Sequence, residues 1–375
     1  MKKLLEFLKA KKSFLPPSKK KNVILDSSQS FIFKNIFKEN NTTIINTRYE
    51  HFNLYILLKS LLRLKISYED YIIEYIRYIE CKIIISFIEN NIFYYRLKKQ
   101  FPEKKIILIQ SGMRPINFFE KLIKHKNLKI DYLFTFSDLY TSKFKKYVDA
   151  KFITLGSFKN NLVDKEIQNN KNSVLFISSG PSFESSMGVF GNIRVNPNIY
   201  FAPEKILLPI IYDFCKRRNL VLKILARSKK SKQLTYEKNF YQRIINSSNF
   251  EFLQNNDWDQ SYKFTDKSKL IVSIYSSMGL ESLSRGNRTI FFNVRDKATK
   301  LKSLSLFWSD DEIEPKGPIW TNEITRDEFQ RLANYAISSS DDEWKKSLRK
   351  IIPKFINYDF GNKQLLKVLD YENSK

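Results

Sequence analysis

Residues 269–294 read KLIVSIYSSMGLESLSRGNRTIFFNV, and they decide the fold because two apolar runs enclose a short segment of helical character. The flanking runs predict buried strands. Ser276 or Ser277 is suited to cap the helix between them, and Gly286 is suited to end it. The same arrangement also suits an anion, because a helix N-terminus presents backbone N–H groups and partial positive charge. The stretch therefore predicts a strand–helix–strand unit, with capping and phosphate binding as alternative roles for its serines.

The rest of the chain repeats this alternation of short apolar runs with helical stretches. Such alternation is typical of βαβ units and mostly parallel sheets, so we predict an α/β fold. A chain of 375 residues suits two domains of roughly 150 to 200 residues each. Candidate strands lie at 22–26, 42–47, 82–88, 104–110, 132–137 and 151–156 in the first half, and at 173–179, 220–226, 250–254, 269–275 and 289–294 in the second.

A polar, asparagine-rich segment between the two halves lacks apolar periodicity and predicts a linker. We expect a basic leader at 1–20, an N-terminal α/β domain at 21–162, the linker at 163–172, a C-terminal α/β domain at 173–322 and C-terminal helices at 323–375. The leader mixes lysines with leucines and two phenylalanines, which suits either a short interfacial helix on an anionic membrane or a frayed basic end. No stretch of about 18 uninterrupted apolar residues predicts a membrane span.

The net charge of +26, from 65 Lys and Arg against 39 Asp and Glu, favours an anionic partner. Candidates are a phosphorylated substrate and an anionic membrane, and the alternative is a solvated lysine-rich surface. The basic residues are spread along the chain without a helix-turn-helix, zinc-finger or RNP signature, so we expect no nucleic-acid partner. Two cysteines and two histidines offer no disulfide framework and no metal cluster, so we expect a cytoplasmic protein without a bound metal.

Functional side chains of an open parallel sheet gather beyond the carboxyl ends of its strands. In the second half, Arg227 ends one strand, where its guanidinium either binds a phosphate or lies at the surface. Glu281 lies one turn into the helix of residues 269–294, where its two carboxylate oxygens can accept both hydroxyls of a ribose. The glycine patterns of P-loop and dinucleotide sites are absent. We predict nucleotide binding by Ser179, Gly180, Arg227, Tyr275, Ser276, Ser277, Gly279 and Glu281.

The strand ends of the first half carry carboxylates, a histidine and amides. Asp26, His51 and Glu89 are candidate general bases, and each alternatively caps a helix or lies at the surface. His51 has the pKa best suited to neutral pH, and Glu89 stands beside two asparagines that offer hydrogen bonds to a sugar. We favour Glu89. The acceptor-side candidates are Arg48, Glu50, Asn90, Asn91, Gln110, Ser111 and Gly112.

Several segments carry a family resemblance. The stretch 269–294 resembles the sugar-nucleotide-binding half of GT-B glycosyltransferases, where a Ser/Thr-Gly helix start and a following Glu meet the donor. The segments ISFIENNIFYYRLKKQFPEKKIILIQSGMR, TRYEHFNLYILLKSLL and LARSKKSKQLTYEKNFY are similar to bacterial surface carbohydrate biosynthesis transferases, over most of residues 20–345. The resemblance implies two Rossmann-like domains facing a cleft, with the C-terminal helices packing across. It also implies chemistry without a bound metal, and the DWD at 257–259 suits an exposed loop better than a metal site.

The resemblance further implies a glycosyltransferase that moves a sugar from a nucleotide-sugar donor to a cell-surface polysaccharide or glycolipid acceptor, without a cofactor. One alternative is a nucleotide-sugar epimerase or polyol-phosphate transferase of the same fold, and another is a non-catalytic anion-binding scaffold at the membrane. A scaffold does not need hydroxyl, glycine and glutamate groups at strand ends in both halves, which favours the enzyme. We expect the enzyme in the cytoplasm, with the leader suited to contact the inner face of the cytoplasmic membrane.

Overall fold

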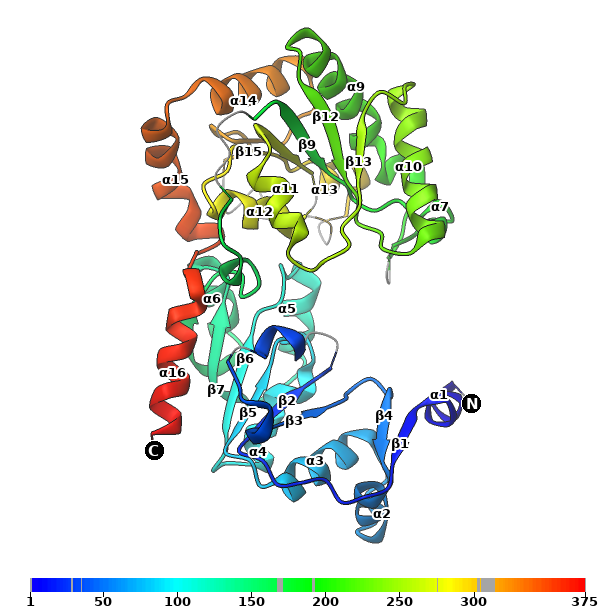
Figure 1. Cartoon of the computed structure of the whole chain (residues 1–375), viewed down its shortest axis with the longest axis vertical. Coiled ribbons are helices and arrows are strands. Elements are labelled where there is room, and N and C mark those ends of the chain that lie inside the picture. The colour runs from blue at the N-terminus through cyan, green and yellow to red at the C-terminus, as the bar shows by residue number, and fades with distance from the viewer. Residues whose placement is uncertain are drawn as a thin grey trace. The chain divides into compact units, whose positions relative to one another are not determined.

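The chain forms two compact α/β units, each built on a six-stranded parallel sheet (Figure 1). The computed structural model describes residues 2–27, 30–34, 36–166, 171–190, 193–274, 276–301, 304 and 314–374. The first unit comprises residues 1–112, 118–159 and 362–375, and the second comprises 113–117 and 160–361. The predicted α/β class with two Rossmann-like units is confirmed, and the last helix of the chain belongs to the first unit.

The sheet of the first unit has the strand order β3-β2-β5-β6-β7-β8. Its strands are β2 (Asn22–Leu25), β3 (Thr42–Ile45), β5 (Ile83–Ser86), β6 (Lys105–Ile109), β7 (Leu128–Thr135) and β8 (Val148–Thr154). Strands β2 and β5 are buried along their whole length, as continuous runs of isoleucine and valine predict for a sheet covered on both faces. The strand order reverses between β2 and β5, so the topological switch point lies beyond Leu25 and Ser86.

Helices and short 3₁₀ turns connect these strands. They are α1 (Lys2–Lys9), η1 (Ser30–Phe33), η2 (Glu39–Asn41), α2 (Leu54–Leu62), α3 (Tyr68–Ile79), η3 (Ile92–Arg96), α4 (Leu97–Gln100), α5 (Ile116–Ile123), α6 (Asp138–Lys145) and α16 (Lys363–Asn373). Asn53 and Ser67 cap α2 and α3, which explains where both helices begin. A small separate sheet pairs β1 (Lys11–Ser13) with β4 (His51–Asn53). Helix α16 is anchored to the first unit because Tyr132 donates to Glu372 at 2.6 Å.

The sheet of the second unit has the order β13-β12-β9-β14-β15-β16. Its strands are β9 (Ser173–Ile177), β12 (Val221–Leu225), β13 (Glu251–Leu253), β14 (Leu270–Ser273), β15 (Thr289–Phe292) and β16 (Trp320–Thr321). Along the chain this is the order 3-2-1-4-5-6, whose switch point lies between β9 and β14. Strand β16 is only two residues long, which is too short for periodicity to predict it, and its Trp320 is buried.

The helices of the second unit are α7 (Phe183–Ser186), α8 (Pro197–Tyr200), α9 (Ala202–Arg217), α10 (Ser231–Ile245), α11 (Gln260–Asp266), α12 (Ser277–Ser284), α13 (Arg295–Thr299), α14 (Arg326–Ser338) and α15 (Asp341–Phe355). The unit also has a short hairpin of β10 (Val189–Phe190) and β11 (Ile193–Arg194). The 3₁₀ turn η4 (Asn160–Leu162) lies at its start, and η6 (Phe360–Asn362) spans its end. Thr325 caps α14, and Ser340 forms a capping box with Glu343 at α15. Helix α14 packs on β14 and β15, where Phe329 contacts the ring of Phe292.

Candidate functional site

The carboxyl edge of the second sheet collects most of the residues predicted to bind a nucleotide. Ile177 of β9 lies opposite both Leu225 of β12 and Ser273 of β14, so these three strands end side by side. The turn 178–180 follows β9, Arg227 follows β12, and α12 begins soon after β14. Of the predicted set, Ser179, Gly180, Arg227, Ser276, Ser277 and Gly279 therefore lie on or next to neighbouring strand ends, and Glu281 lies further along α12. Tyr275 lies outside the described residues.

A buried glutamate supports the two loops at this edge. Glu237 of α10 accepts hydrogen bonds from the backbone N–H groups of Arg227 and Ser228, both at 3.0 Å, and from the hydroxyl of Ser178. Ser178 in turn accepts from the N–H of Gly180 at 2.9 Å. A carboxylate that binds several N–H groups in a buried site fixes the loop conformation strongly. Glu237 therefore holds the ends of β9 and β12 in one geometry.

A second buried ion pair supports the same turn. Arg295, at the start of α13, pairs with Glu204 of α9 and donates to the hydroxyl of Ser179 at 2.9 Å. The side chains of Arg295 and Glu204 are 1% and 0% exposed. The guanidinium also lies 4.1 Å from the ring centre of Tyr200. Sequence reasoning missed all three residues, Glu204, Arg295 and Glu237. Glu204 and Glu237 lie within helices, away from the strand ends, and although Arg295 follows β15, its pairing with Glu204 joins distant parts of the chain.

The N-terminus of α12 has the geometry of a capped helix. The hydroxyl of Ser276 accepts from the N–H of Met278 at 3.3 Å, so the capping role is present in this structure. Gly279 is required for packing, since a Cβ there would lie 2.7 Å from the side chain of Ser273 and 2.9 Å from Phe291. Gly286, with φ +81°, ends the helix as predicted. Capping uses the Ser276 side chain, and the phosphate role of the helix start remains a prediction.

Glu281 lies in the second turn of α12 and is 7% exposed. Its backbone carbonyl accepts from Ser284 at 2.8 Å and from Asn160 at 3.4 Å. The predicted position, one turn beyond the helix start, is therefore correct. Its contact with a ribose is not tested by the structure.

Arg227 offers an exposed charged group at this edge. Its side chain is exposed, and its guanidinium donates to the carbonyl of Ser179 at 3.1 Å. Gly180 has φ +73°, and a Cβ there would lie 2.6 Å from Cδ of Arg227. Glycine is thus needed for both the backbone conformation and the close approach of the arginine. The turn and Arg227 form one packed group at the carboxyl ends of β9 and β12.

Two predicted residues of the first unit form an ion pair. Asp26, which follows β2, is buried and accepts from Nε of Arg48 at 2.6 Å and from Thr47 at 3.2 Å. Arg48 is half-exposed, and its backbone N–H donates to exposed Glu50 at 3.3 Å. The candidate base and the candidate acceptor-binding arginine are therefore partners.

The ends of β5, β6 and β7 are joined by polar contacts. Glu89 is fully buried and accepts from both the N–H and the hydroxyl of Ser111, at 2.8 and 3.1 Å. Gln110, also buried, accepts from the N–H of Phe136 at 2.8 Å and donates to the carbonyl of Gly112 at 2.9 Å. Gln110 thus acts as a bridge between two strand ends. Glu89 and Asp26 follow the neighbouring strands β5 and β2.

The remaining candidates of the first unit lie in different surroundings. Asn91 caps η3, accepting from the N–H of Phe93 at 3.1 Å, and Asn90 is exposed. His51 lies in β4, which pairs with β1 and not with the main sheet. Burial and, to a lesser extent, the charge of Lys11 lower the pKa of His51. The structure therefore separates His51 from the six-stranded sheet that carries Asp26 and Glu89.

An aromatic cavity of about 370 Å³ opens in the first unit. It is lined by Thr47, Tyr49, Ser67, Tyr68, Glu69, Ile72, Asn91 and Phe93. The rings of Tyr49 and Tyr68 stack with centroids 4.0 Å apart, and the Tyr68 hydroxyl donates to the carbonyl of Asn46 at 3.0 Å. Sequence reasoning predicted Asn91 but missed both tyrosines. Tyr68 comes from helix α3 and not from a strand end, whereas Tyr49 lies between the candidates Arg48 and Glu50 and was not itself proposed.

The described residues contain no group of three or more His, Cys, Asp or Glu side chains arranged to hold a metal ion. Metal-independent chemistry remains a prediction from the resemblance. Likewise, among the described residues no helix combines the length and the apolar character that a membrane span requires.

A protein-family model described as "putative O-antigen biosynthesis protein" matches residues 107–373. Similar solved structures include a "putative UDP-N-acetylglucosamine 2-epimerase" from Listeria monocytogenes, with 10% identity, 94% and 97% of the two chains covered and a TM-score of 0.52. A variant of the wall teichoic acid polymerase TagF has 12% identity, 96% and 89% coverage and a TM-score of 0.51. A glycosyltransferase from Rickettsia africae has 11% identity, 94% and 99% coverage and a TM-score of 0.50.

The curated proteins gave no match to this sequence. At identities of 10 to 12%, the structural likeness establishes the fold, which is of the GT-B type. The expectation of that fold is confirmed.

Proposed function

We propose that this chain, which belongs to the O-antigen biosynthesis protein family, is a glycosyltransferase that moves a sugar from a nucleotide-sugar donor to a cell-surface polysaccharide or glycolipid acceptor. The observation that carries the proposal is the carboxyl edge of the second sheet. There the turn 178–180, exposed Arg227 and the start of α12 lie on neighbouring strand ends, held in place by buried carboxylates. Ligands of open parallel sheets bind at such switch points.

In this proposal, the second unit binds the donor. Glycosyl transfer breaks the bond between the sugar and a phosphate oxygen, so negative charge grows on the leaving phosphate. The guanidinium of Arg227 and the N-terminal end of α12 would stabilise that charge. Glu281 would accept the ribose hydroxyls and orient the nucleotide.

The first unit then binds the acceptor and supplies the base. A base removes the proton of the acceptor hydroxyl while its oxygen attacks the anomeric carbon. Glu89 remains our first choice, with His51 and Asp26 as alternatives. Asp26 already forms an ion pair with Arg48. The cavity beside Tyr49 and Tyr68 suits a sugar, whose apolar face stacks on aromatic rings.

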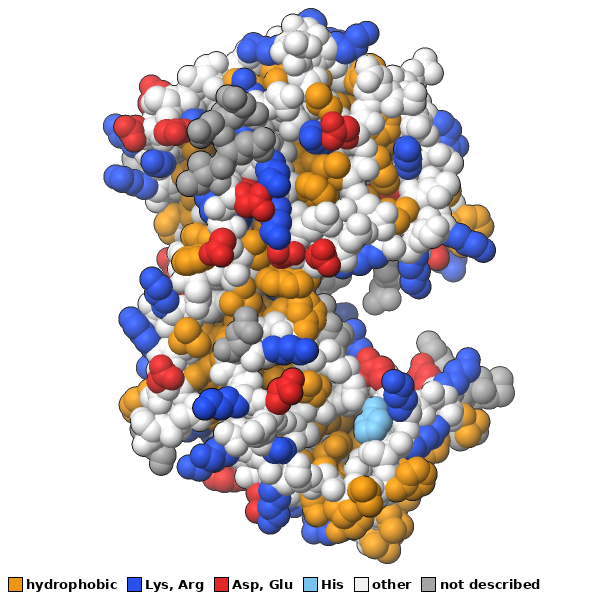
Figure 2. All heavy atoms as spheres, in the orientation of Figure 1, with side chains coloured by type: hydrophobic (Ala, Val, Ile, Leu, Met, Phe, Trp, Pro, Cys, Tyr) orange, Lys and Arg blue, Asp and Glu red, His pale blue; other side chains and the backbone are white. Residues whose placement is uncertain are grey.

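We further propose that the enzyme acts in the cytoplasm, at an anionic membrane surface. Leu58, Leu61 and Leu62 of α2 and the following Leu64 and Ile66 are all exposed, Leu64 by 90%. Figure 2 shows hydrophobic side chains gathered on the surface at α2. Basic residues alternate with this set in the sequence LKSLLRLKI, so apolar and anionic attraction would act together.

Vesicle sedimentation tests the membrane part. Deleting residues 1–20 should weaken binding to anionic vesicles, and Leu62→Ser with Ile66→Ser should weaken it further. Ile206→Ser, at a half-exposed position of α9 in the second unit, is the matched control. Sedimentation that is equal for all these variants would contradict membrane docking through this surface.

The enzyme proposal is tested by thermal shift against UDP-, GDP-, CDP- and CMP-linked sugars. A ligand at about 100 times its dissociation constant stabilises the folded protein by about 2.7 kcal/mol. One nucleotide family should raise the unfolding temperature, Arg227→Gln should reduce this shift, and exposed Arg217→Gln at the end of α9 should preserve it. No shift with any donor would favour a non-catalytic scaffold, and epimerisation of the donor without an acceptor would identify an epimerase.

A further inference from the structure

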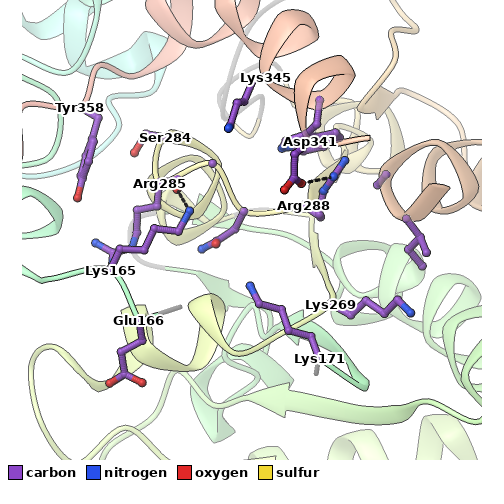
Figure 3. A pocket seen from close by; sticks show the side chains of 15 residues that line it. Lys165, Glu166, Lys171, Lys269, Ser284, Arg285, Arg288, Asp341, Lys345 and Tyr358 are labelled. Atoms are coloured by element: carbon purple, nitrogen blue, oxygen red, sulfur yellow. Dashed lines mark hydrogen bonds and ion pairs between the residues drawn. The ribbon is translucent and has the colours of Figure 1, made fainter. Parts of the chain in front are cut away.

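The second unit contains a cavity of about 720 Å³ at the amino-terminal edge of its sheet, opposite the proposed donor edge. Lys171 precedes β9, Lys269 precedes β14 and Arg288 precedes β15, so these residues mark the strand starts. The cavity also borders the C-terminal end of α12, at Ser284 and beyond, and Lys345 of α15 (Figure 3). We call this cavity the basic pocket.

The basic pocket has more positive than negative charge. Its lining includes six basic side chains, namely Lys165, Lys171, Lys269, Arg285, Arg288 and Lys345, and two acidic ones, Glu166 and Asp341. Asp341 pairs with Arg288 at 2.7 Å, and Glu166 pairs with Lys267 at 2.8 Å. Arg285 is neutralised by the buried carboxylate of Asp266, with Nε 2.9 Å from Oδ1. Within the described residues, Lys165, Lys171, Lys269 and Lys345 have no carboxylate partner.

Three of these lysines share one space. Figure 3 shows the side chains of Lys165, Lys171 and Lys345 directed into the pocket from different segments, while Lys269 lies at its edge. The ammonium of Lys165 donates to the backbone carbonyl of Arg285 at 2.6 Å. Burial is the largest cause that lowers the pKa of Lys165 and of Lys171. Neighbouring cations lower both pKa values further, whereas the carboxylates of Asp266 and Asp341 partly offset this effect. The cations therefore repel one another, and an anion between them would relieve this repulsion.

We propose that the basic pocket binds a soluble phosphorylated molecule, bearing a diphosphate group, at a site separate from the donor edge. Its volume lies in the range of about 300 to 1,000 Å³ that is typical of small-molecule sites. Lysine ammonium groups bind phosphate as point charges. The wall also offers apolar contact, because Ala336 and Ile337 line it. Trp344 lines it as well, and the guanidinium of Arg288 lies 5.0 Å from the centre of its ring.

A soluble ligand fits better than a lipid headgroup. A pocket that receives a membrane lipid is expected to be surrounded by exposed apolar residues that enter the bilayer. Among the described residues that line the basic pocket, no large hydrophobic side chain is exposed. The exposed leucines of α2 belong to the first unit. The ligand that this pocket selects is thus a compact multivalent anion.

Lysine acylation of the full chain, read by mass spectrometry, tests the site residue by residue. Inorganic pyrophosphate should protect Lys165, Lys171 and Lys345 several-fold, and more strongly than orthophosphate at equal ionic strength. Exposed Lys346, the neighbour of Lys345 on α15, and exposed Lys238 on α10 are the internal controls and should not change. Equal protection of Lys238 and Lys346 would reduce the effect to general screening and overturn the proposal.

Two double variants extend the test to affinity. By calorimetry, K171Q with K345Q should bind pyrophosphate at least tenfold more weakly at the protected site, whereas K238Q with K346Q should bind like the wild type. Arg227→Gln, at the other end of the sheet, should leave the protection of Lys171 unchanged, which separates this site from the donor edge. If the first double variant does not fold, protection in the wild-type chain decides alone.

Vesicles distinguish the source of the phosphate. Vesicles containing phosphatidic acid should protect the three lysines less than pyrophosphate does. Protection by the vesicles and not by pyrophosphate would assign the site to a lipid headgroup and contradict a soluble ligand. Absence of protection by both would overturn the anion site.

Discussion

The two units share one construction, and their carboxyl edges differ in chemistry. In the first unit the edge carries Asp26 and Glu89, with an aromatic cavity beside Tyr68. In the second unit the edge carries hydroxyls, a glycine turn and Arg227, with the acidic groups buried beneath. In both units the parallel sheet determines where a ligand binds, whereas the residues of the loops determine the charge of the binding site.

The support behind the two edges differs as well. In the second unit, Glu204 and Arg295 pair in full burial, so their charges are shielded from solvent. In the first unit, the Asp26 carboxylate is buried as well, but its partner Arg48 has a side chain that is 51% exposed. Loss of one partner of a fully buried pair leaves an uncompensated charge inside the protein, whereas water screens a remaining charge that is exposed. The same kind of contact should therefore matter far more in the second unit.

The largest effect is expected from breaking the buried pair. Glu204→Ala should lower the free energy of unfolding of the second unit by about 3 to 5 kcal/mol, because Arg295 loses its partner inside the protein. Asp26→Asn should cost no more than about 1 kcal/mol, because Arg48 turns to solvent. Urea unfolding of both variants measures the difference. Equal losses in the free energy of unfolding would show that the two ion pairs contribute equally, which would contradict this prediction.

A smaller effect is expected in the aromatic cavity. Tyr68→Leu should raise the KM for the acceptor about fivefold, because aromatic stacking contributes about 0.5 to 1.5 kcal/mol. The KM for the donor should not change. Tyr68→Phe keeps the ring and is the control, with an acceptor KM near that of the wild type. If Tyr68→Leu raised the donor KM instead, the division of labour between the units would be reversed.

The smallest effect concerns His51. Its pKa lies below the ordinary 6.5 because burial disfavours the charged imidazole, and Lys11 adds to this. The unfolded chain therefore binds the proton more readily, so stability from this group is complete above pH 6.5 and is lost as pH falls towards the lowered pKa. His51→Gln should remove this part of the acid dependence in urea midpoints between pH 5 and 8. An unchanged pH dependence would show that His51 titrates normally.

Local signals made most of the fold predictable from the sequence. The strands of both sheets are short apolar runs between polar turns, and α12 is bounded by Ser276 and Gly286, which act as the patterns indicate. Strand β16 was missed because its two residues carry no period. The register of β16 depends on Phe291, opposite Trp320, which is a tertiary contact.

The candidate site was predictable in position and less so in its contacts. Strand ends identified Arg227 and the turn at Gly180, since sheet topology alone gathers such residues. The pairing of Glu204 with Arg295 joins residues 91 positions apart, and no local pattern encodes it. The same holds for Asp26 and Arg48, which were predicted as separate groups and lie in one ion pair because β2 and β3 are neighbours.

Binding of the donor to Glu281→Gln tests the central claim most directly, namely that the carboxyl edge of the second sheet holds the nucleotide. Glutamine keeps the size of this largely buried side chain and removes its charge. We predict that calorimetry with the nucleotide sugar identified by thermal shift will show a loss of about tenfold to a hundredfold in affinity, equivalent to roughly 1.5 to 3 kcal/mol, with an unchanged urea midpoint. A Glu281→Gln protein that binds this donor as tightly as the wild type would contradict the account.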